Sequence, residues 1–136
     1  MLSPTDIIHK MLNNDAMSQW LGIKILSIQK GNVSIQMTVR EEMTNGFDIA
    51  HGGITYSLSD SSLAFSANTY GIHAVSVETS ISHLKPVQIG DVLTTTVEEI
   101  SLTKRISVYH IKVTNQNNHL VSTLKGTMYL TGKEWE

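Results

Sequence analysis

The sequence of 136 residues contains no cysteine. This absence excludes a disulfide framework, a thiolate metal site and a cysteine nucleophile. The chain also lacks any run of about 18 apolar residues, the length that a membrane span needs. Its first residues have neither the basic start nor the apolar stretch of a signal peptide. We therefore expect a cytoplasmic protein that does not enter a membrane.

Positive charge is also scarce. Ten Lys and Arg against twelve Asp and Glu give a formal net charge of −2, without a basic run. Attraction to the phosphate backbone supplies much of the affinity for nucleic acid, so we expect no nucleic-acid partner. Six histidines are present, but none are paired at the short spacing of zinc ligands, and we expect no metal site.

The length of the chain bounds its organisation. A chain of this size is near the commonest size of one domain and can bury about two-thirds of its unfolded surface. No linker, repeat or low-complexity segment interrupts the sequence. We expect residues 1–136 to form a single domain.

Two helices are predicted near the N-terminus. After Ser3, which is typical of a helix start and is followed by a proline, apolar residues recur at helical spacing. Asp15 is a typical cap for a short second helix, and Gly22 stands where that helix would end. Residues 33–39 then alternate strictly between apolar and polar, which predicts a half-buried strand after a hairpin turn at residues 30–32.

A long helix is predicted at residues 52–70, and small side chains surround most of it. Small side chains let neighbouring backbone approach closely, so we expect this helix to be wrapped by other elements. Four β-branched, alternating runs predict strands at 74–84, 92–101, 105–114 and 119–131, which we expect to form a meander of hairpins. The whole predicts an α+β fold, a curved antiparallel sheet wrapped around one long central helix.

Asp60 lies in the interior of the predicted long helix. A carboxylate there is costly unless it is paired, hydrogen-bonded or used in chemistry, although it could also meet solvent or a nearby serine. His51-Gly52-Gly53 stands at the start of the same helix, where free N–H groups favour an oxyanion. The glycines could equally serve only as a tight turn, and Asn45 could be a plain turn residue before Gly46.

The combination of these residues says more than each one alone. Acyl transfer to water needs donors for a developing oxyanion and a carboxylate that attacks or deprotonates water. Both occur between Asn45 and Asp60. However, Gly52 and Asp60 are separated by about 12 Å along one helix, at a rise of about 1.5 Å per residue. If both serve one reaction, they should come from the two chains of a symmetric dimer.

Ser76 falls on a predicted strand, where it would share one face with Glu78 and Ser80 as a polar row. Three basic residues stand at predicted strand ends, where they could meet coenzyme phosphates or remain solvated: Lys85, Lys104 and Arg105. Together with Gly53 in the glycine turn, these three are our candidate substrate contacts.

The sequence resembles the hotdog-fold acyl-CoA thioesterase superfamily, and within it the phenylacetate-degradation thioesterases of the PaaI type. The specific part is Asn45 with His51-Gly52-Gly53 and Leu58-Ser59-Asp60. Further matching segments extend over nearly the whole chain, from Asn14-Asp15-Ala16 to Val113-Thr114-Asn115-Gln116. One departure is Ser59, where many relatives carry alanine.

This resemblance implies a hotdog fold that is active as a homodimer and usually pairs into a tetramer. It implies hydrolysis of acyl-CoA, typically aryl-acetyl or hydroxyphenylacetyl-CoA, to free acid and coenzyme A, which is part of the substrate, so no cofactor is needed. By position, it implies that Asp60 is the catalytic carboxylate and that the Gly52 N–H and the Asn45 side chain polarise the carbonyl. It further implies that His51 orients Asn45 and that Ser76 helps to place the attacking water.

Two other functions remain open at this point. A hydratase or dehydratase of the same fold would act on acyl-CoA or carrier-protein thioesters, but it pairs a catalytic histidine with a carboxylate in motifs that this sequence lacks. A non-catalytic acyl-CoA-binding protein would bind the same ligand and release little or no thiol. Thiol release measured against double-bond formation separates these functions.

Overall fold

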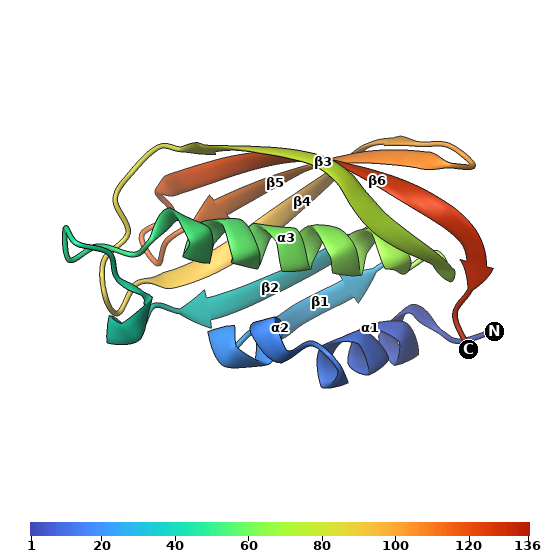
Figure 1. Ribbon diagram of the computed structural model, residues 1–136, viewed down its shortest axis with the longest axis horizontal. Coiled ribbons are helices and arrows are strands. Elements are labelled where there is room, and N and C mark those ends of the chain that lie inside the picture. The colour runs from blue at the N-terminus through green and yellow to red at the C-terminus, as the bar shows by residue number, and fades with distance from the viewer.

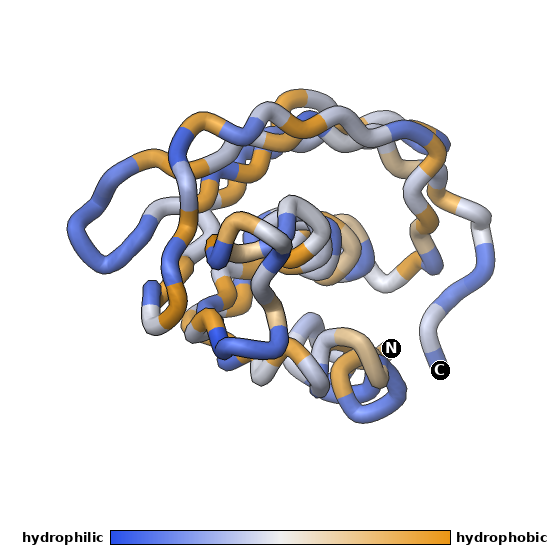
Figure 2. The backbone as a smooth tube through the Cα atoms, turned by 60° about the vertical axis from the view of Figure 1, so that its left-hand side comes forward, coloured by the Kyte–Doolittle hydropathy of each residue, from blue (hydrophilic) through white to orange (hydrophobic).

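The fold is a curved sheet around one long helix. The computed structural model describes residues 1–136. Helix α3 (Gly52–Asn68) lies in the concave side of a six-stranded antiparallel sheet, and α1 (Pro4–Asn13) and α2 (Ala16–Leu21) pack below it, beside β1 (Lys24–Gln29) (Figure 1). In a view turned toward the axis of α3, the sheet curls over the helix (Figure 2). The predicted α+β hotdog arrangement is confirmed.

The strands follow the predicted positions closely. The sheet order is β1-β2-β4-β5-β6-β3, and a short 3-10 helix, η1 (Glu41–Met43), follows β2. The remaining strands are β2 (Asn32–Thr38), β3 (Ile72–His83), β4 (Val92–Leu102), β5 (Ile106–Thr114) and β6 (Leu120–Glu134).

The N-terminal elements form for local reasons. The Ser3 side chain accepts a hydrogen bond from the Asp6 N–H, and the Asp6 side chain accepts one from the Ser3 N–H, which is a capping box. Asp15 caps α2, and Gly22 ends it in the left-handed conformation at φ 74°. Gly31, at φ 71°, forms the turn between β1 and β2. These three local predictions are confirmed.

The expected meander of the last four strands is wrong in one respect. Strands β4, β5 and β6 do form a meander, but β3 pairs only with β6, at the edge of the sheet, and β4 pairs with β2. The link at residues 84–91 is too long for a tight hairpin and buries Val87 in the core. Its end is tied to the residue that follows β2, because the Gly90 N–H donates to the Val39 carbonyl.

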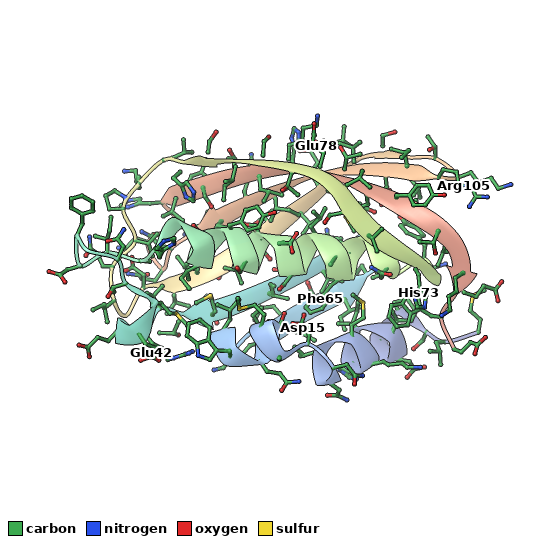
Figure 3. The ribbon with its side chains drawn as sticks, in the orientation of Figure 1. Asp15, Glu42, Phe65, His73, Glu78 and Arg105 are labelled. Carbon is green, nitrogen blue, oxygen red and sulfur yellow. The ribbon has the colours of Figure 1, made fainter.

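A β-bulge in β3 changes which face its side chains occupy. The register shifts between Ser76 and Glu78, so that Ser76 pairs with the buried Met128 and Glu78 pairs with Thr127. Ser76 therefore lies on the inner face, whereas Glu78 points away from α3 (Figure 3). The expected polar row of Ser76 with Glu78 is wrong, because the extra residue Val77 reverses the alternation.

Most of the circumference of helix α3 is covered by other elements, as its small side chains predicted, but one face stays uncovered. Leu58, Leu63 and Phe65 are fully buried. The helix serines bond neighbouring elements: the Ser62 hydroxyl donates to the Val33 carbonyl, and the Ser66 hydroxyl accepts from the Val33 N–H. These bonds satisfy buried polar groups and hold α3 against β2. The helix ends at Asn68, two residues earlier than predicted.

Gly126 of β6 is a point where backbone and helix approach closely. A Cβ atom at this position would lie 2.4 Å from Leu63 Cδ2, and Leu63 is fully buried. Gly126→Ala is therefore expected to lower the free energy of unfolding by about 1–3 kcal/mol, as overpacking of a filled core does. Urea denaturation measures this loss. Gly46→Ala is the control, because nothing lies within 4 Å of its added Cβ; equal losses in the two variants would contradict the packing argument.

Candidate active site

Asn45 sits in a tight loop that leaves its amide nitrogen free. The Asn45 backbone N–H donates to the Ile49 carbonyl, and the Asn45 Oδ1 accepts from the Phe47 N–H at 2.8 Å. Because these bonds hold the backbone and one end of the side chain, they orient the other end, Nδ2. No protein group accepts a hydrogen bond from Nδ2, so it can donate to a bound molecule.

The start of α3 supplies a second free donor. His51 is the N-cap, and its Nδ1 accepts from the Gly53 N–H at 2.9 Å. The preceding donor of the helix, the Gly52 N–H, has no partner in the protein. Unpaired N–H groups at a helix N-terminus favour negative charge. Gly52 is thus suited to hold a developing oxyanion.

Asn45 and Gly52 face one pocket of about 400 Å³. Thr55, His83 and Lys85 also line it. Thr55 and His83 were not among the residues predicted from the sequence. One weak signal existed for each, since Thr55 follows Gly52 by about one helical turn and His83 stands at a strand end two residues before Lys85. No acidic side chain lines the pocket.

Asp60 lies outside this pocket, on the uncovered face of α3. It is half-buried and makes no hydrogen bond or ion pair. Burial, and secondarily the nearby charge of Asp15, raise the pKa of its carboxyl above the ordinary value. In Figure 1 no element lies in front of α3, between β3 above it and α2 below it. The partly exposed residues of α3 after its first turn lie on this one face: Tyr56, Ser57, Asp60 and Ala64.

The raised pKa of Asp60 has a consequence for stability. Because the folded state favours the protonated carboxyl, ionisation costs stability, and this cost appears as pH rises through the interval between the unfolded and the folded pKa. Asp60→Asn removes the charge and is expected to raise the free energy of unfolding at about pH 7, with a difference that fades near pH 3. Denaturation at the two pH values measures it. The exposed Glu134→Gln is the control, and a neutral-pH loss of stability in Asp60→Asn would contradict the sign.

The other predicted residues of the α3 start and of β3 lie outside the pocket that Asn45 and Gly52 share. His51 makes no hydrogen bond to Asn45, and the Asn45 side chain is instead held by the Phe47 N–H. The orienting role of His51 stays a prediction. His51 and Gly53 instead line a second pocket of about 340 Å³ beside the uncovered face of α3. Ser76 is exposed on the inner face of β3 and bonds no other side chain.

The basic residues are divided between the two ends of the molecule. Lys85 lines the pocket near the start of α3. Lys104 and Arg105 lie in the β4–β5 turn, at the end opposite to that start (Figure 3). Within one chain, therefore, only Lys85 joins the pocket. No group of three His, Asp or Glu side chains could hold a metal ion, and no helix is long and apolar enough to cross a membrane.

Comparisons with known proteins show the family to which the chain is related. Residues 47–122 match the family model described as thioesterase superfamily. The chain is 36% identical to the acyl-coenzyme A thioesterase PaaI of Escherichia coli (strain K12), over 91% of this chain and 89% of that protein. The solved structure of the E. coli PaaI protein, from the phenylacetic acid degradation operon, matches with a TM-score of 0.94 and 34% identity, covering 96% of this chain and 95% of that one.

A second solved structure contains a ligand. A hypothetical thioesterase protein of Streptococcus pneumoniae TIGR4, solved with coenzyme A, matches with a TM-score of 0.86 and 28% identity. The match covers 93% of this chain and 98% of that chain.

Proposed function

Because the chain belongs to the thioesterase superfamily and is a hotdog-fold acyl-CoA thioesterase, we propose that it hydrolyses aryl-acetyl-CoA in an active site shared by two subunits. The observation that carries this proposal is the convergence of two unpartnered donors, Asn45 Nδ2 and the Gly52 N–H, on one pocket. Two fixed donors polarise a thioester carbonyl and stabilise the oxyanion that forms when it is attacked.

Asp60 acts as the catalytic carboxylate. Half-buried, unpaired and with a raised pKa, it is the form of carboxylate that general-base chemistry uses. As a base, it takes a proton from water while the water oxygen bonds to the carbonyl carbon, after which the carbon–sulfur bond breaks and coenzyme A leaves as the thiolate. As a nucleophile, a carboxylate oxygen would bond to the carbonyl carbon while the carbon–sulfur bond breaks and coenzyme A leaves as the thiolate, and water would then hydrolyse the resulting anhydride to the free acid and the Asp60 carboxylate. Single-turnover hydrolysis in ¹⁸O-water separates the two, because only the nucleophile incorporates label into Asp60.

The carboxylate that completes each site comes from the partner chain. The helical rise separates Gly52 from Asp60 by about 12 Å within one chain, which is too far for attack on one carbonyl. A two-fold axis that brings Asp60 of one α3 to Gly52 of the other passes near position 56, midway between them. The Tyr56 and Thr79 hydroxyls form a hydrogen bond at 2.7 Å. Because Thr79 lies near the middle of β3, an axis near position 56 also passes near the middle of this strand.

The edge of the sheet supports this dimer. β3 is an edge strand whose outer side has no partner, and it carries Val75 and Val77, which are 53% and 60% exposed. An exposed apolar edge strand is a template for pairing with a second chain. Antiparallel pairing of two β3 strands would place the two α3 helices side by side and bring the partner's β4–β5 turn, with Lys104 and Arg105, toward the pocket end. Further pairing into a dimer of dimers remains a prediction.

The acyl group is tested by a thiol-release screen. The similarity to a protein from a phenylacetic acid degradation operon supports an aryl-acetyl group. Phenylacetyl-, hydroxyphenylacetyl-, benzoyl-, short-chain and long-chain acyl-CoA are compared at equal concentration. A clear preference for hydroxyphenylacetyl- or phenylacetyl-CoA is expected. A flat, slow profile would contradict the aryl-acetyl assignment.

A further inference from the structure

His83, the last residue of β3, lies against the start of α3. A Cβ atom built on Gly52 would lie 3.1 Å from the His83 Nε2 and 3.2 Å from its Cε1. The imidazole edge therefore covers the backbone of the residue that offers the free N–H. Any bound group that accepts a hydrogen bond from Gly52 extends past this ring.

The Thr55 hydroxyl lies beside one ring nitrogen of His83. The Thr55 hydroxyl donates to the Gly52 carbonyl at 3.1 Å, so toward His83 it can only accept. Its oxygen lies 3.3 Å from the His83 Nδ1. In the tautomer whose Nδ1–H donates to this oxygen, the ring has its lone pair on Nε2. His83 thus presents a hydrogen-bond acceptor beside Gly52.

This acceptor has few equivalents in the pocket. The other two polar side chains beside it each already have a hydrogen-bond partner at the oxygen, which is the Phe47 N–H for Asn45 Oδ1 and His83 Nδ1 for the Thr55 hydroxyl. The remaining side walls are mostly apolar, and Lys85 is a donor only. A ligand N–H that enters this pocket next to the carbonyl site would meet His83 Nε2 as its side-chain acceptor.

We propose that His83 Nε2 accepts a hydrogen bond from the amide N–H of the thiol half of the substrate, the amide two carbons from the thioester sulfur. This assignment rests on the proposed function. Every coenzyme A thioester carries this donor at a constant spacing from the carbonyl that Asn45 and Gly52 hold. Lys85 supports an orientation in which the coenzyme half of the substrate lies in this pocket, because a cation in the lining favours the anionic coenzyme half over an apolar acyl group.

The acyl half of the substrate then extends from the other side of the carbonyl. In the proposed dimer, the partner's Asp60 faces this chain's Gly52, beside the pocket that adjoins the uncovered face of this chain's α3. The lining of that pocket includes the apolar side chains Met17, Met43 and Ile54. In this orientation an aryl-acetyl group packs against these apolar side chains. His83 is therefore a specificity residue for the thiol half.

Two thioesters that differ in one atom test the assignment. The same acyl group is attached to N-acetylcysteamine in one thioester and to O-acetyl-2-mercaptoethanol in the other. The second thiol has an oxygen where the first has the amide N–H. His83→Phe keeps a ring against Gly52 but lacks the acceptor. It is expected to lower kcat/KM about 10-fold for the amide thioester, mainly through KM, and less than about twofold for the ester, as loss of one hydrogen bond remote from the reacting centre predicts.

Further variants sharpen the outcome. His83→Gln retains an acceptor and is expected to recover most of the amide preference, and His119→Phe, at an exposed histidine outside the pocket, should change neither substrate. Equal losses on both thioesters, or none, would overturn the assignment. So would a loss that follows the hydroxyl of a hydroxyphenylacetyl group rather than the amide. A wild-type protein that releases no thiol from any acyl-CoA would instead overturn the proposed function itself.

Discussion

Asp60→Asn is expected to lower kcat for acyl-CoA hydrolysis by about 10³-fold, because a positioned general base or nucleophile contributes on the order of 10²–10⁴. The amide that replaces the carboxylate has nearly the same size but cannot take a proton from water. KM should change little, since Asp60 touches the attacking water rather than the coenzyme. Steady-state thiol release with one saturating acyl-CoA measures the effect.

The same variant separates catalysis from folding. Since ionised Asp60 is unfavourable in the folded state, Asp60→Asn should be at least as stable as the wild type at neutral pH while it is nearly inactive. Ser59→Ala, at the preceding and fully buried helix position whose hydroxyl has no partner, is the matched control and should keep most activity. Near-normal turnover in a folded Asp60→Asn protein would exclude Asp60 from the chemistry.

Mixing two inactive variants should restore activity, which is the second large effect. Asn45→Ala removes a carbonyl donor and is expected to cost about 10²-fold, and Asp60→Asn removes the carboxylate. If each site takes Asn45 from one chain and Asp60 from the other, a mixed dimer has one intact site and one doubly defective site. Random re-pairing makes half the dimers mixed, so about a quarter of wild-type activity should return.

The complementation experiment discriminates sharply between the two arrangements. The two variant chains carry different tags and are co-expressed, and the dimers that carry both tags are purified. These mixed dimers should show about half of wild-type activity, because one of their two sites is intact. Sites contained within one chain would give no recovery in any mixture. A double variant, Asn45→Ala with Asp60→Asn, paired with wild type controls for subunit exchange. In this dimer both sites lose one component, so its activity should be near zero in the shared arrangement and half in the unshared one.

The sequence alone predicted the features that neighbouring residues encode. Ser3 and Asp15 start the two short helices and Gly22 ends the second, because caps are made from side chains and backbone only a few residues apart. The small-residue composition of 52–70 predicted a helix wrapped by other elements. Leu58 and Phe65 are fully buried, although one face of α3 stays uncovered. The spacing of Gly52 and Asp60 already showed that one chain cannot bring both to one carbonyl.

Features that depend on distant partners could not be obtained in this way. The bulge in β3 is defined only against the register of β6, so the alternation around Ser76 misplaced Glu78. β3 pairs with β6, which is far from it in the sequence, and the alternation within β3 does not indicate which strand it will pair with. The hydrogen bonds of Asn45 and His51 depend on a loop conformation that the residue types alone do not specify.

The sequence by itself determined the elements, the family resemblance and the distance that separates donors from carboxylate, because each follows from local spacing and composition. Only the tertiary structure decided that Asn45 and Gly52 share a pocket, that Thr55 and His83 complete it, and that Asp60 stands unpaired on the uncovered face of α3. The physical reason is that these contacts join residues of different elements. Their geometry is set when the sheet closes over the helix.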